Sequence, residues 1–257
     1  MALTFIEHAS PNFDVRKTAI DMLVVHYTGM KTAEDSLARL CDGAGDNRVS
    51  AHYLIEEDGR IHRLVEEEDR AWHAGVSYWA GERDINSCSI GIELQNPGWE
   101  YDYHAFPEPQ MQAFLALAKD VVARHDISPF RVLGHSDVAP TRKEDPGELF
   151  DWERCAKEAV GFWPTMMASE KLEAPLFVPF EAGGASVATA QEALQYIGYE
   201  CDANGRFDAK TMMVITAFQR HWRPKRVDGV LDPDTITRIQ AVADAVEALE
   251  RKRSDRR

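Results

Sequence analysis

The stretch Met22-Leu-Val-Val-His-Tyr-Thr-Gly29 decides how the fold of this 257-residue chain is interpreted. A short apolar run that ends in glycine is typical of a strand buried in the middle of a sheet. His26 lies near the carboxyl end of the run, where open α/β sheets gather their ligands. This position makes His26 a candidate ligand-binding residue. A lone histidine in a strand is more often a hydrogen-bonded core residue, however, and the run alone favours that structural role for His26.

Strand and helix patterns alternate around this run. Residues 1–20 look like a lead-in with turn signals, and Ser87–Leu94 favours a second central strand. The Asp58-Gly59 dipeptide predicts the turn of a hairpin. The other predicted elements are a helix from Thr32 to Asp42 with Thr32 as N-cap, an amphipathic helix from Pro107 to His125, a strand from Phe130 to His135, and a helix from Phe150 to Phe162 with Asp151 as N-cap. We therefore expect an α/β fold, a mixed central sheet flanked by helices.

A second, small domain is expected at the C-terminus. Residues 164–186 show little periodicity and contain several prolines and glycines, which is typical of a linker. Three helical patterns follow, Val187–Ile197, Thr211–Trp222 and Pro233–Arg251. The predicted division is a larger first domain over residues 1–165, a linker over 166–186, and a three-helix domain with a basic tail over 187–257.

The small domain contains a weak internal repeat. Asn204-Gly-Arg-Phe-Asp-Ala-Lys-Thr211 and Asp228-Gly-Val-Leu-Asp-Pro-Asp-Thr235 carry a turn glycine, an apolar residue, an aspartate and a threonine in register. Each segment precedes or opens a predicted helix. The repeat therefore predicts two similar loops that lead into helices.

Composition and charge exclude two classes of protein. Twenty-nine basic and forty-three acidic residues leave a net charge of −14, whereas a nucleic-acid partner requires a basic surface. The basic stretch 251–257 is interpreted as a frayed, solvated tail. No segment approaches the roughly 18 apolar residues that a transmembrane helix needs. The chain is expected to bind neither nucleic acid nor the membrane interior.

The cysteines and the N-terminus bear on the compartment. Cys41, Cys88, Cys155 and Cys201 lie far apart with no CxxC pairing, which favours reduced thiols over disulfides. Residues 1–8 lack the basic and apolar regions of a secretory signal. We expect a cytoplasmic protein, with the periplasm or cell envelope as the alternative.

The loop 134–147, Gly134-His-Ser-Asp-Val-Ala-Pro-Thr-Arg-Lys-Glu-Asp-Pro-Gly, gathers the most reactive residue types in the chain. Its prolines predict irregular structure, and loops on a rigid scaffold are where chemistry usually lies. His135 and Asp145 would supply two of the three protein ligands of a catalytic zinc ion, and His26 the third. Asp137, Asp151, His52 and His73 have ligand groups of the same kinds, so spacing alone leaves the ligand set open.

Two further residues suit amide hydrolysis beside such a metal. Glu93 lies in an apolar strand, where a buried carboxylate would make a general base; exposure on one face is the alternative. Lys143 would place a cation near a developing oxyanion. Residues 77–86, with Tyr78, Trp79 and Arg83, would line a cleft or form a surface loop that packs on the domain.

Six motifs resemble those of one family. In chain order they are Val24-Val-His-Tyr-Thr, Ser50-Ala-His-Tyr-Leu-Ile, Ala71-Trp-His-Ala-Gly, Ser89-Ile-Gly-Ile-Glu-Leu, Gly134-His-Ser-Asp-Val-Ala-Pro and Arg142-Lys-Glu-Asp-Pro-Gly. Over roughly residues 20–163 the chain closely resembles the zinc-dependent N-acetylmuramoyl-L-alanine amidases of the amidase type 2 family, which includes the peptidoglycan recognition proteins. The agreement of six motifs in sequence and spacing makes the resemblance specific.

The resemblance implies a role for each site residue. It implies Zn²⁺ on His26, His135 and Asp145, Glu93 as the catalytic base, and Lys143 as the group that stabilises the transition-state charge. The resemblance also implies that His73 is a residue of the substrate cleft. Arg83 and Asn86 are the remaining candidates for substrate binding. The non-catalytic recognition proteins typically lose a metal ligand, and none is missing here.

The C-terminal segment is similar to the three-helix peptidoglycan-binding domain. The matching residues include Ala190-Gln-Glu-Ala-Leu, Gly198-Tyr, Gly205-Arg-Phe, Ala217-Phe-Gln and the second repeat segment. The expected function is hydrolysis of the amide between N-acetylmuramic acid and L-alanine in peptidoglycan or (1,6-anhydro)muropeptides, in cell-wall recycling or turnover. The alternative is a non-catalytic binding or sensing protein.

Overall fold

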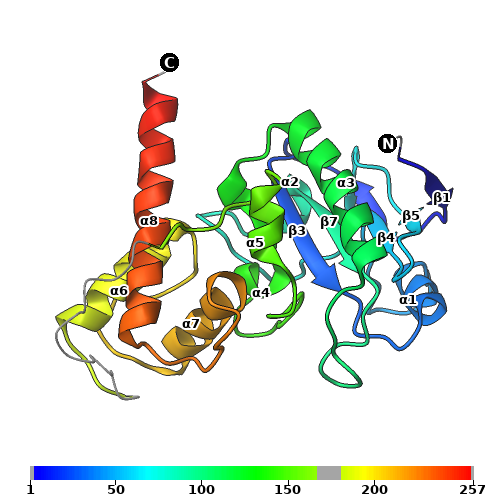
Figure 1. The fold of residues 1–257 in the computed structure, drawn as a ribbon. Coiled ribbons are helices and arrows are strands. Elements are labelled where there is room, and N and C mark those ends of the chain that lie inside the picture. The colour runs from blue at the N-terminus through cyan, green and yellow to red at the C-terminus, as the bar shows by residue number, and fades with distance from the viewer. Residues whose placement is uncertain (1–2, 167–180, 256–257) are drawn as a thin grey trace.

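The computed structural model describes residues 3–166 and 181–255, and its first part is built on a six-stranded sheet (Figure 1). The strand order is β1-β5-β4-β7-β3-β8, with a separate antiparallel pair β2-β6. Strands β4, β7, β3 and β8 run parallel, whereas β5 is antiparallel to β4. The strands are β1 (Phe5–Glu7), β2 (Phe13–Val15), β3 (Met22–Tyr27), β4 (Tyr53–Ile55), β5 (Ile61–Arg63), β6 (Asp69–Ala71), β7 (Ser89–Leu94) and β8 (Val132–Gly134). The predicted mixed central sheet is confirmed.

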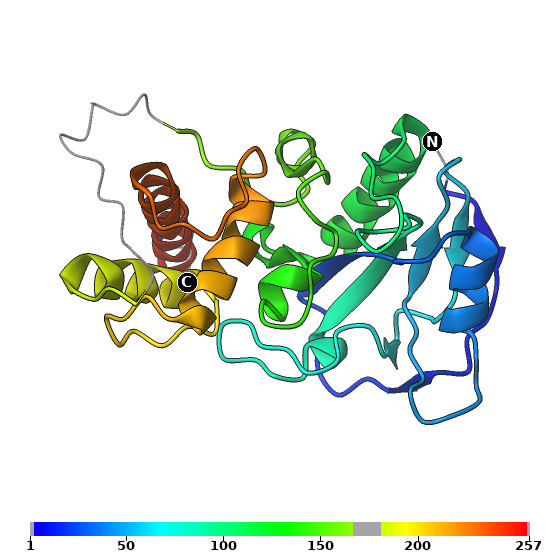
Figure 2. The ribbon, with the colours of Figure 1, turned by 90° about the horizontal axis from the view of Figure 1, so that it is seen from below.

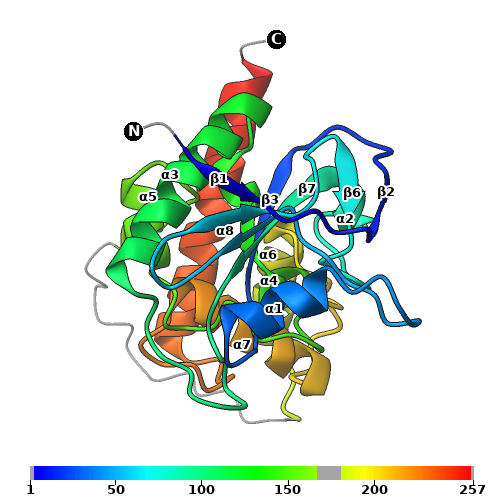
Figure 3. The ribbon, with the colours of Figure 1, turned by 90° about the vertical axis from the view of Figure 1, so that its right-hand side faces the viewer.

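The alternation of side chains along β3 assigns the two faces of the sheet. Leu23 and Val25 belong to the core under helices α3 (Glu108–His125) and α5 (Trp152–Lys157). Met22 and Val24 belong to a second core, on the opposite face, to which the C-terminal helices contribute. His26 continues this second series, so the alternation directs its side chain away from α3. Figure 3 shows α3 and α5 on one side of β3 and β7, and the β2-β6 pair on the other.

The predicted local signals in the first part are present in the structure. Helix α1 (Ala33–Leu40) begins after Thr32, whose hydroxyl accepts a hydrogen bond from the Asp35 amide at 3.1 Å. Strands β4 and β5 form the predicted hairpin, and Gly59 in its turn has φ +89°. That φ favours glycine, and an added Cβ would also lie 2.8 Å from the Pro109 carbonyl oxygen.

Four sequence predictions are corrected by the structure. The lead-in contains β1 and β2, which occupy the edges of the two sheets. The loop 134–147 begins with a helical turn, α4 (His135–Val138), because the Asp137 carboxylate accepts a hydrogen bond from the Gly134 amide and caps the turn. Helix α5 ends at Lys157, five residues before the predicted Phe162, since Ala159 adopts φ +63°. Residues 251–254 of the basic tail belong to the last helix.

Three helices form the C-terminal part, as predicted: α6 (Ala185–Ile197), α7 (Ala209–Trp222) and α8 (Pro233–Ser254). A short helix α2 (Ile85–Cys88) and a 3₁₀ turn (Pro129–Arg131) complete the elements that the structure describes. Of the predicted linker, residues 167–180 lie outside the described residues. Figure 2 shows the three C-terminal helices grouped beside the sheet, with α7 next to the loop that carries α4.

The internal repeat is real, and two buried glutamines explain it. The side-chain amide of Gln191 donates to the carbonyl oxygen of Arg206 and to the hydroxyl of Thr211, and its oxygen accepts from the Gly205 amide. Gln219 makes the equivalent bonds in the second segment, to Val230, Thr235 and Gly229. Each glutamine therefore satisfies the backbone of one helix-entry loop.

The C-terminal helices and the sheet share one hydrophobic core. It contains Met22, Val24 and Leu133 from the sheet together with Leu194 and Phe218 from the helices. Trp79, in the loop before α2, packs on Tyr199 with a ring-centroid distance of 4.8 Å. The two parts of the chain are therefore packed against one another over an apolar interface. Within the described residues, none of the helices has the length and apolar character needed to cross a membrane.

Candidate metal centre and active site

The carboxyl edge of the parallel strands collects the candidate residues. His26 and Glu93 are directly opposite each other in the β3-β7 register, and His135 follows β8 immediately. In parallel strands, residues in register point to the same face, so His26 and Glu93 project to the side that faces the C-terminal helices. The location agrees with the general position of ligand sites in open α/β sheets.

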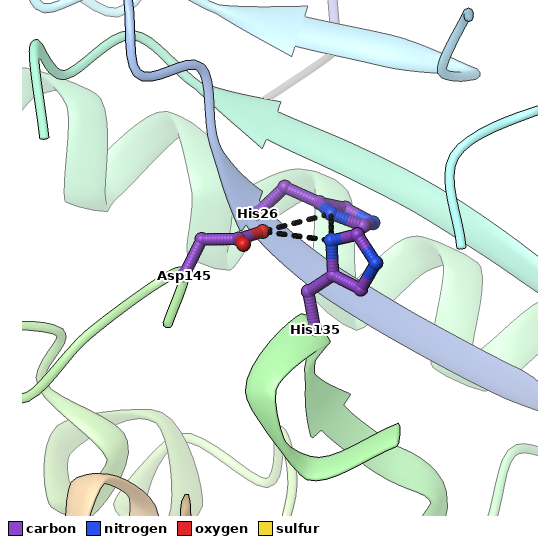
Figure 4. Close-up of side chains that lie close together, drawn as sticks. All are labelled: His26, His135 and Asp145. Atoms are coloured by element: carbon purple, nitrogen blue, oxygen red, sulfur yellow. Dashed lines mark hydrogen bonds and ion pairs between the residues drawn. The ribbon is translucent and has the colours of Figure 1, made fainter. Parts of the chain in front are cut away.

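Three donor atoms from distant parts of the chain converge at this edge (Figure 4). His26 Nδ1 lies 2.9 Å from His135 Nδ1, and each of these nitrogens lies 3.0 Å from Asp145 Oδ2. All three residues are buried. The Ser136 amide donates to the Asp145 carbonyl at 2.9 Å. This bond ties together the two ends of the ligand loop, residues 134–147.

Hydrogen bonding determines which nitrogen of His135 carries a proton. His135 Nε2 lies 3.1 Å from the carbonyl oxygen of Ala74, which accepts hydrogen bonds only, so Nε2 carries a proton. Arg142 donates to the same carbonyl at 2.7 Å and holds it in place. In the neutral ring, Nδ1 therefore presents a lone pair toward His26 and Asp145.

A chain of hydrogen bonds orients His26 in the same way. The Ser89 hydroxyl donates to the Ile85 carbonyl at 2.5 Å, so its oxygen accepts from His73 Nε2 at 3.2 Å. His73 Nδ1 then accepts from His26 Nε2 at 3.0 Å. Burial and neighbouring histidines lower the pKa of His73 well below its usual value, and burial followed by His135 lowers the pKa of His26 to about 4. Both rings are neutral near pH 7, and His26 Nδ1 presents a lone pair.

The three facing atoms are thus all hydrogen-bond acceptors. Two lone pairs and a carboxylate at about 3 Å repel one another unless a cation lies between them. The N,N,O donor set suits a borderline divalent cation, and three protein ligands leave a position open for water or substrate. The residues present therefore fit a divalent metal.

Glu93 borders the donor atoms from the neighbouring strand. It lines a cavity of about 510 Å³, together with His73, His135, Lys143 and Asp145. Its Oε2 atom is buried and has no hydrogen-bond partner among the described residues. Burial, and then the charge of Asp145, raise the pKa of Glu93 to about 8, while Lys143 acts in the opposite direction. A partly desolvated carboxylate of this kind is suited to proton transfer.

The rim of the cavity is aromatic and basic. Tyr27, Trp72 and Trp99 line it together with the basic residues Arg39, Arg142 and Lys143. Trp99 is 56% exposed, and within the described part of the chain the Lys143 ammonium makes no hydrogen bond or ion pair. An elongated, polar ligand with a sugar or peptide portion would contact such a rim.

The other predicted substrate residues lie behind or beside the cavity. Both ring nitrogens of His73 are engaged inside the protein, so only its ring surface borders the cavity. The side-chain oxygen of Asn86 accepts from the amides of His73 and Ala74, at 3.0 and 2.8 Å, and shapes that segment. Arg83 lies outside the cavity lining, where it forms an ion pair of 2.6 Å with Glu200 of the C-terminal part. Substrate contacts by these residues stay predictions.

The alternatives to the ligand set have other partners. His52 Nδ1 accepts from the Gly91 amide at 2.9 Å, and the Asp151 carboxylate caps α5. Asp137 binds Tyr199 and His221 of the C-terminal part of the chain. None of these side chains joins the cluster of three donor atoms.

Three residues that orient the donors were missed in the sequence. They are Ser89, Gly91 and Arg142. An added Cβ on Gly91 would lie 2.5 Å from the His73 ring, so this strand position is a glycine because the ring covers it. A glycine between two isoleucines in an otherwise apolar strand is the available signal, but nothing local to it indicates which side chain approaches.

The comparisons with known proteins agree with this geometry. The family model Amidase_2, N-acetylmuramoyl-L-alanine amidase, matches residues 16–148, and the PG_binding_1 family of peptidoglycan binding domains matches residues 183–239. The N-acetylmuramoyl-L-alanine amidase AmiD of Escherichia coli is 38% identical over 94% of this chain and 89% of its own length. The 1,6-anhydro-N-acetylmuramyl-L-alanine amidase AmpD of Haemophilus influenzae is 37% identical over 56% of this chain and 86% of its own.

Solved structures show the same fold. A complex of E. coli AmiD with anhydro-N-acetylmuramic acid-L-Ala-D-gamma-Glu-L-Lys has a TM-score of 0.75 at 36% identity, and covers 88% of this chain and 89% of that one. AmpDh3 of Pseudomonas aeruginosa in complex with anhydromuramic pentapeptide has a TM-score of 0.77 at 34% identity, and covers 88% and 92%. The chain thus belongs to the N-acetylmuramoyl-L-alanine amidase family.

Proposed function

We propose that this amidase uses Zn²⁺ to hydrolyse the amide between N-acetylmuramic acid and L-alanine in muropeptides or peptidoglycan. The observation that carries the proposal is the convergence of three buried acceptor atoms, about 3 Å apart, beside a carboxylate of raised pKa. The family membership supplies the bond that is cut. The AmiD and AmpDh3 structures contain anhydromuramyl peptides, and this supports the substrate class.

His26 Nδ1, His135 Nδ1 and Asp145 Oδ2 are the atoms that would hold the metal. A bound Zn²⁺ lowers the pKa of water to about 7 and polarises a carbonyl group. His73 and the Ala74 carbonyl keep the two imidazole rings in the tautomer that ligation requires. The protein therefore holds the donor set in place before the metal binds.

Glu93 and Lys143 divide the remaining chemistry. Glu93 accepts the proton of the attacking water and returns it to the L-alanine nitrogen, because a carboxyl of raised pKa holds a proton more readily than an ordinary glutamate and can still release it. Lys143 lines the same cavity and has no competing ion pair among the described residues, so its ammonium is free to stabilise the oxyanion that forms on the lactyl carbonyl. His73, Arg83 and Asn86 remain the proposed substrate-binding residues.

The test is hydrolysis of a soluble anhydromuropeptide, with release of the free stem peptide measured by mass spectrometry. The expected result is turnover that is lost on treatment with a chelator and restored by stoichiometric Zn²⁺. Persistent turnover in the fully metal-free protein would refute the metal mechanism. Binding without release of peptide by the zinc-loaded protein would favour a sensing role. Parallel rates on intact sacculi would establish the preferred form of the substrate.

We also propose the domain division and the compartment that the sequence suggested. The two matched families fall on either side of residues 149–182, which supports a boundary near residues 166–186. The four free cysteines support a reducing compartment, the cytoplasm, with the cell envelope as the alternative. Fractionation of cells that express the full-length natural protein, followed by immunoblotting, tests the compartment.

A further inference from the structure

We propose that the C-terminal helices act as a positioning element of the metal centre, in addition to any binding of polymer. Two adjacent residues of α7, Arg220 and His221, contact the loop 134–147 at Glu144 and Asp137 respectively. Glu144 precedes the ligand Asp145, and Asp137 lies in the same helical turn as the ligand His135. The inference rests on the proposed metal site.

Asp137 is the central residue of this contact. The residue is 1% exposed. The Tyr199 hydroxyl donates to Oδ1 at 2.5 Å, and His221 Nδ1 lies 2.7 Å from Oδ2. The second oxygen also accepts from the Gly134 amide at 2.8 Å, which caps the turn that begins at His135. Of the three partners that this carboxylate has among the described residues, two thus come from the C-terminal part of the chain: Tyr199 from the loop after α6 and His221 from α7.

The His221 ring stacks on tryptophans from both parts of the molecule. It stacks on Trp152 of α5 at a centroid distance of 3.8 Å and on Trp222 at 3.7 Å. Its Nε2 atom is buried without a hydrogen-bond partner in the described part of the chain, so the only polar contact of the ring is the one with Asp137. A ring fixed in this way holds the Asp137 carboxylate in position and stabilises its negative charge by the hydrogen bond.

The second contact restrains the other end of the ligand loop. A guanidinium nitrogen of Arg220 lies 3.4 Å from the Glu144 carboxylate, which is half exposed, so this ion pair is the weaker of the two. The bond from the Ser136 amide to the Asp145 carbonyl joins the two contacts across the loop. Displacement of α7 would therefore shift both His135 and Asp145.

The hydrophobic core that the sheet shares with the C-terminal helices opposes such a displacement of α7. Two backbone hydrogen bonds add to this restraint. Ala80 donates its amide to the Gly198 carbonyl at 2.8 Å, and Tyr78 donates to the Val138 carbonyl at the end of α4, also at 2.8 Å. The loop around Trp79 therefore bridges the C-terminal part to the helical turn that carries His135. These contacts make Asp137, Tyr199 and His221 positioning residues, which act on the metal through His135.

The test is the double variant Tyr199→Phe/His221→Phe in the full chain. It keeps an aromatic ring at both positions and removes the two donors to Asp137. It breaks no bond at His221 Nε2, which has no partner among the described residues. Mutation of the residues that hold metal ligands in place typically weakens metal binding 10- to 100-fold. We expect a loss of that size in zinc affinity, measured by competition with a chromophoric chelator. We also expect an altered visible absorption spectrum of the cobalt-substituted protein. With a soluble muropeptide at saturating zinc, kcat should fall while KM is unchanged.

Tyr196→Phe is the matched control. Its hydroxyl also donates to a carboxylate, that of Glu250, at 2.8 Å, but both residues lie within the C-terminal helices. Tyr196→Phe should leave zinc affinity and the cobalt spectrum unchanged. If the double variant does not fold, Tyr199→Phe alone is measured, with a smaller loss of zinc affinity expected.

The outcomes distinguish this inference from the proposed function. Parental zinc affinity and cobalt spectrum in a folded variant would overturn the positioning role and leave the amidase mechanism intact. A parental protein that binds no zinc would overturn both. Weaker zinc binding in the variant and not in Tyr196→Phe supports the positioning role.

Discussion

His73 Nδ1 lies 3.0 Å from His26 Nε2, on the side of the His26 ring that faces away from Asp145. The bond makes the Nε2 proton of His26 a donor and leaves Nδ1 as the atom that faces the metal site. His73 is held in turn by Ser89. A residue implied as part of the substrate cleft is therefore also a determinant of the metal ligand's tautomer.

Replacement of His73 by alanine should weaken zinc binding. His26 Nε2 would lose its buried acceptor, and the ring would be free to rotate or change tautomer. We expect a 10- to 100-fold rise in the zinc dissociation constant, measured by chelator competition. His104→Ala, on the partly exposed His104 outside the cavity lining, is the control and should bind zinc normally. Unchanged affinity in His73→Ala would rule out this role.

Glu93→Gln should remove proton transfer while the metal is retained. The expected loss in kcat is 10²- to 10⁴-fold, with zinc content unchanged by elemental analysis. In the parental protein, activity should fall as the pH decreases through the pKa of Glu93, because only the ionised carboxylate accepts a proton. That pKa is raised to about 8, and a bound cation would lower it. The acidic limb of the pH–activity profile should therefore lie between the usual pKa of a glutamate and 8. The variant should lack this limb.

Lys143→Met should lower kcat about 10²- to 10³-fold and leave zinc affinity unchanged, since the ammonium is proposed to stabilise charge that develops only in the transition state. Single-turnover rates on a soluble muropeptide provide the measurement. Lys157→Met is the matched control, because Lys157 is exposed, is paired with Glu153, and lies outside the cavity that Glu93 and Lys143 line. A pure rise in KM would show instead that Lys143 binds the ground state.

Glu67→Gln should lower stability in a pH-dependent manner. Burial opposes ionisation of Glu67, but hydrogen bonds from Arg124, His125 and Tyr53 outweigh it and lower its pKa to about 2. Because the folded pKa lies below the unfolded one, this stabilisation is complete above the unfolded pKa of about 4.5 and is lost as the pH falls toward 2. A shift of this size corresponds to about 3 kcal/mol at most.

Urea unfolding of the parental protein and the Glu67 variant at pH 6.5 and pH 3 measures this effect. The difference in the free energy of unfolding should shrink by about half at the lower pH. Glu66→Gln is the control, since Glu66 is 54% exposed and its pair with Arg63 contributes little. An equal difference at both pH values would contradict the assignment.

Gly198→Ala should destabilise the interface between the sheet and the C-terminal helices. Gly198 has φ +137°, and an added Cβ would lie 2.5 Å from the buried Trp79 ring. Gly81→Ala is the matched control, because Gly81 has φ +92° with no atom within 4 Å of an added Cβ. Backbone strain of about 1 kcal/mol is common to both, and overpacking should add about 1–3 kcal/mol for Gly198 alone. Thermal unfolding checks the difference; similar losses would exclude the clash.

The sequence by itself determined the parts of the fold that depend on short-range patterns. The apolar run at β3, the Asp58-Gly59 turn, the cap at Thr32 and the glycine-aspartate-threonine repeat are each contained within a few residues. Their periodicity and backbone preferences act locally, so they predicted the sheet, the hairpin and the three C-terminal helices. The position of His26 at a strand end also followed from pattern. The selection of His26, His135 and Asp145 over His52, Asp137 and Asp151 followed from the family motifs and not from spacing.

Only the tertiary structure decided how the site is held. His26 and His135 are 109 residues apart, and Asp137 and Tyr199 are 62 apart. Contacts over such separations depend on which faces of the sheet and helices pack together, and no local pattern records this. The tautomers of the ligands, the Glu93 oxygen that has no partner in the described part of the chain, and the contact between α7 and the ligand loop therefore emerged from packing. The physical reason is that burial and charge at the site are properties of the assembled core, whereas strand and helix preferences belong to the chain.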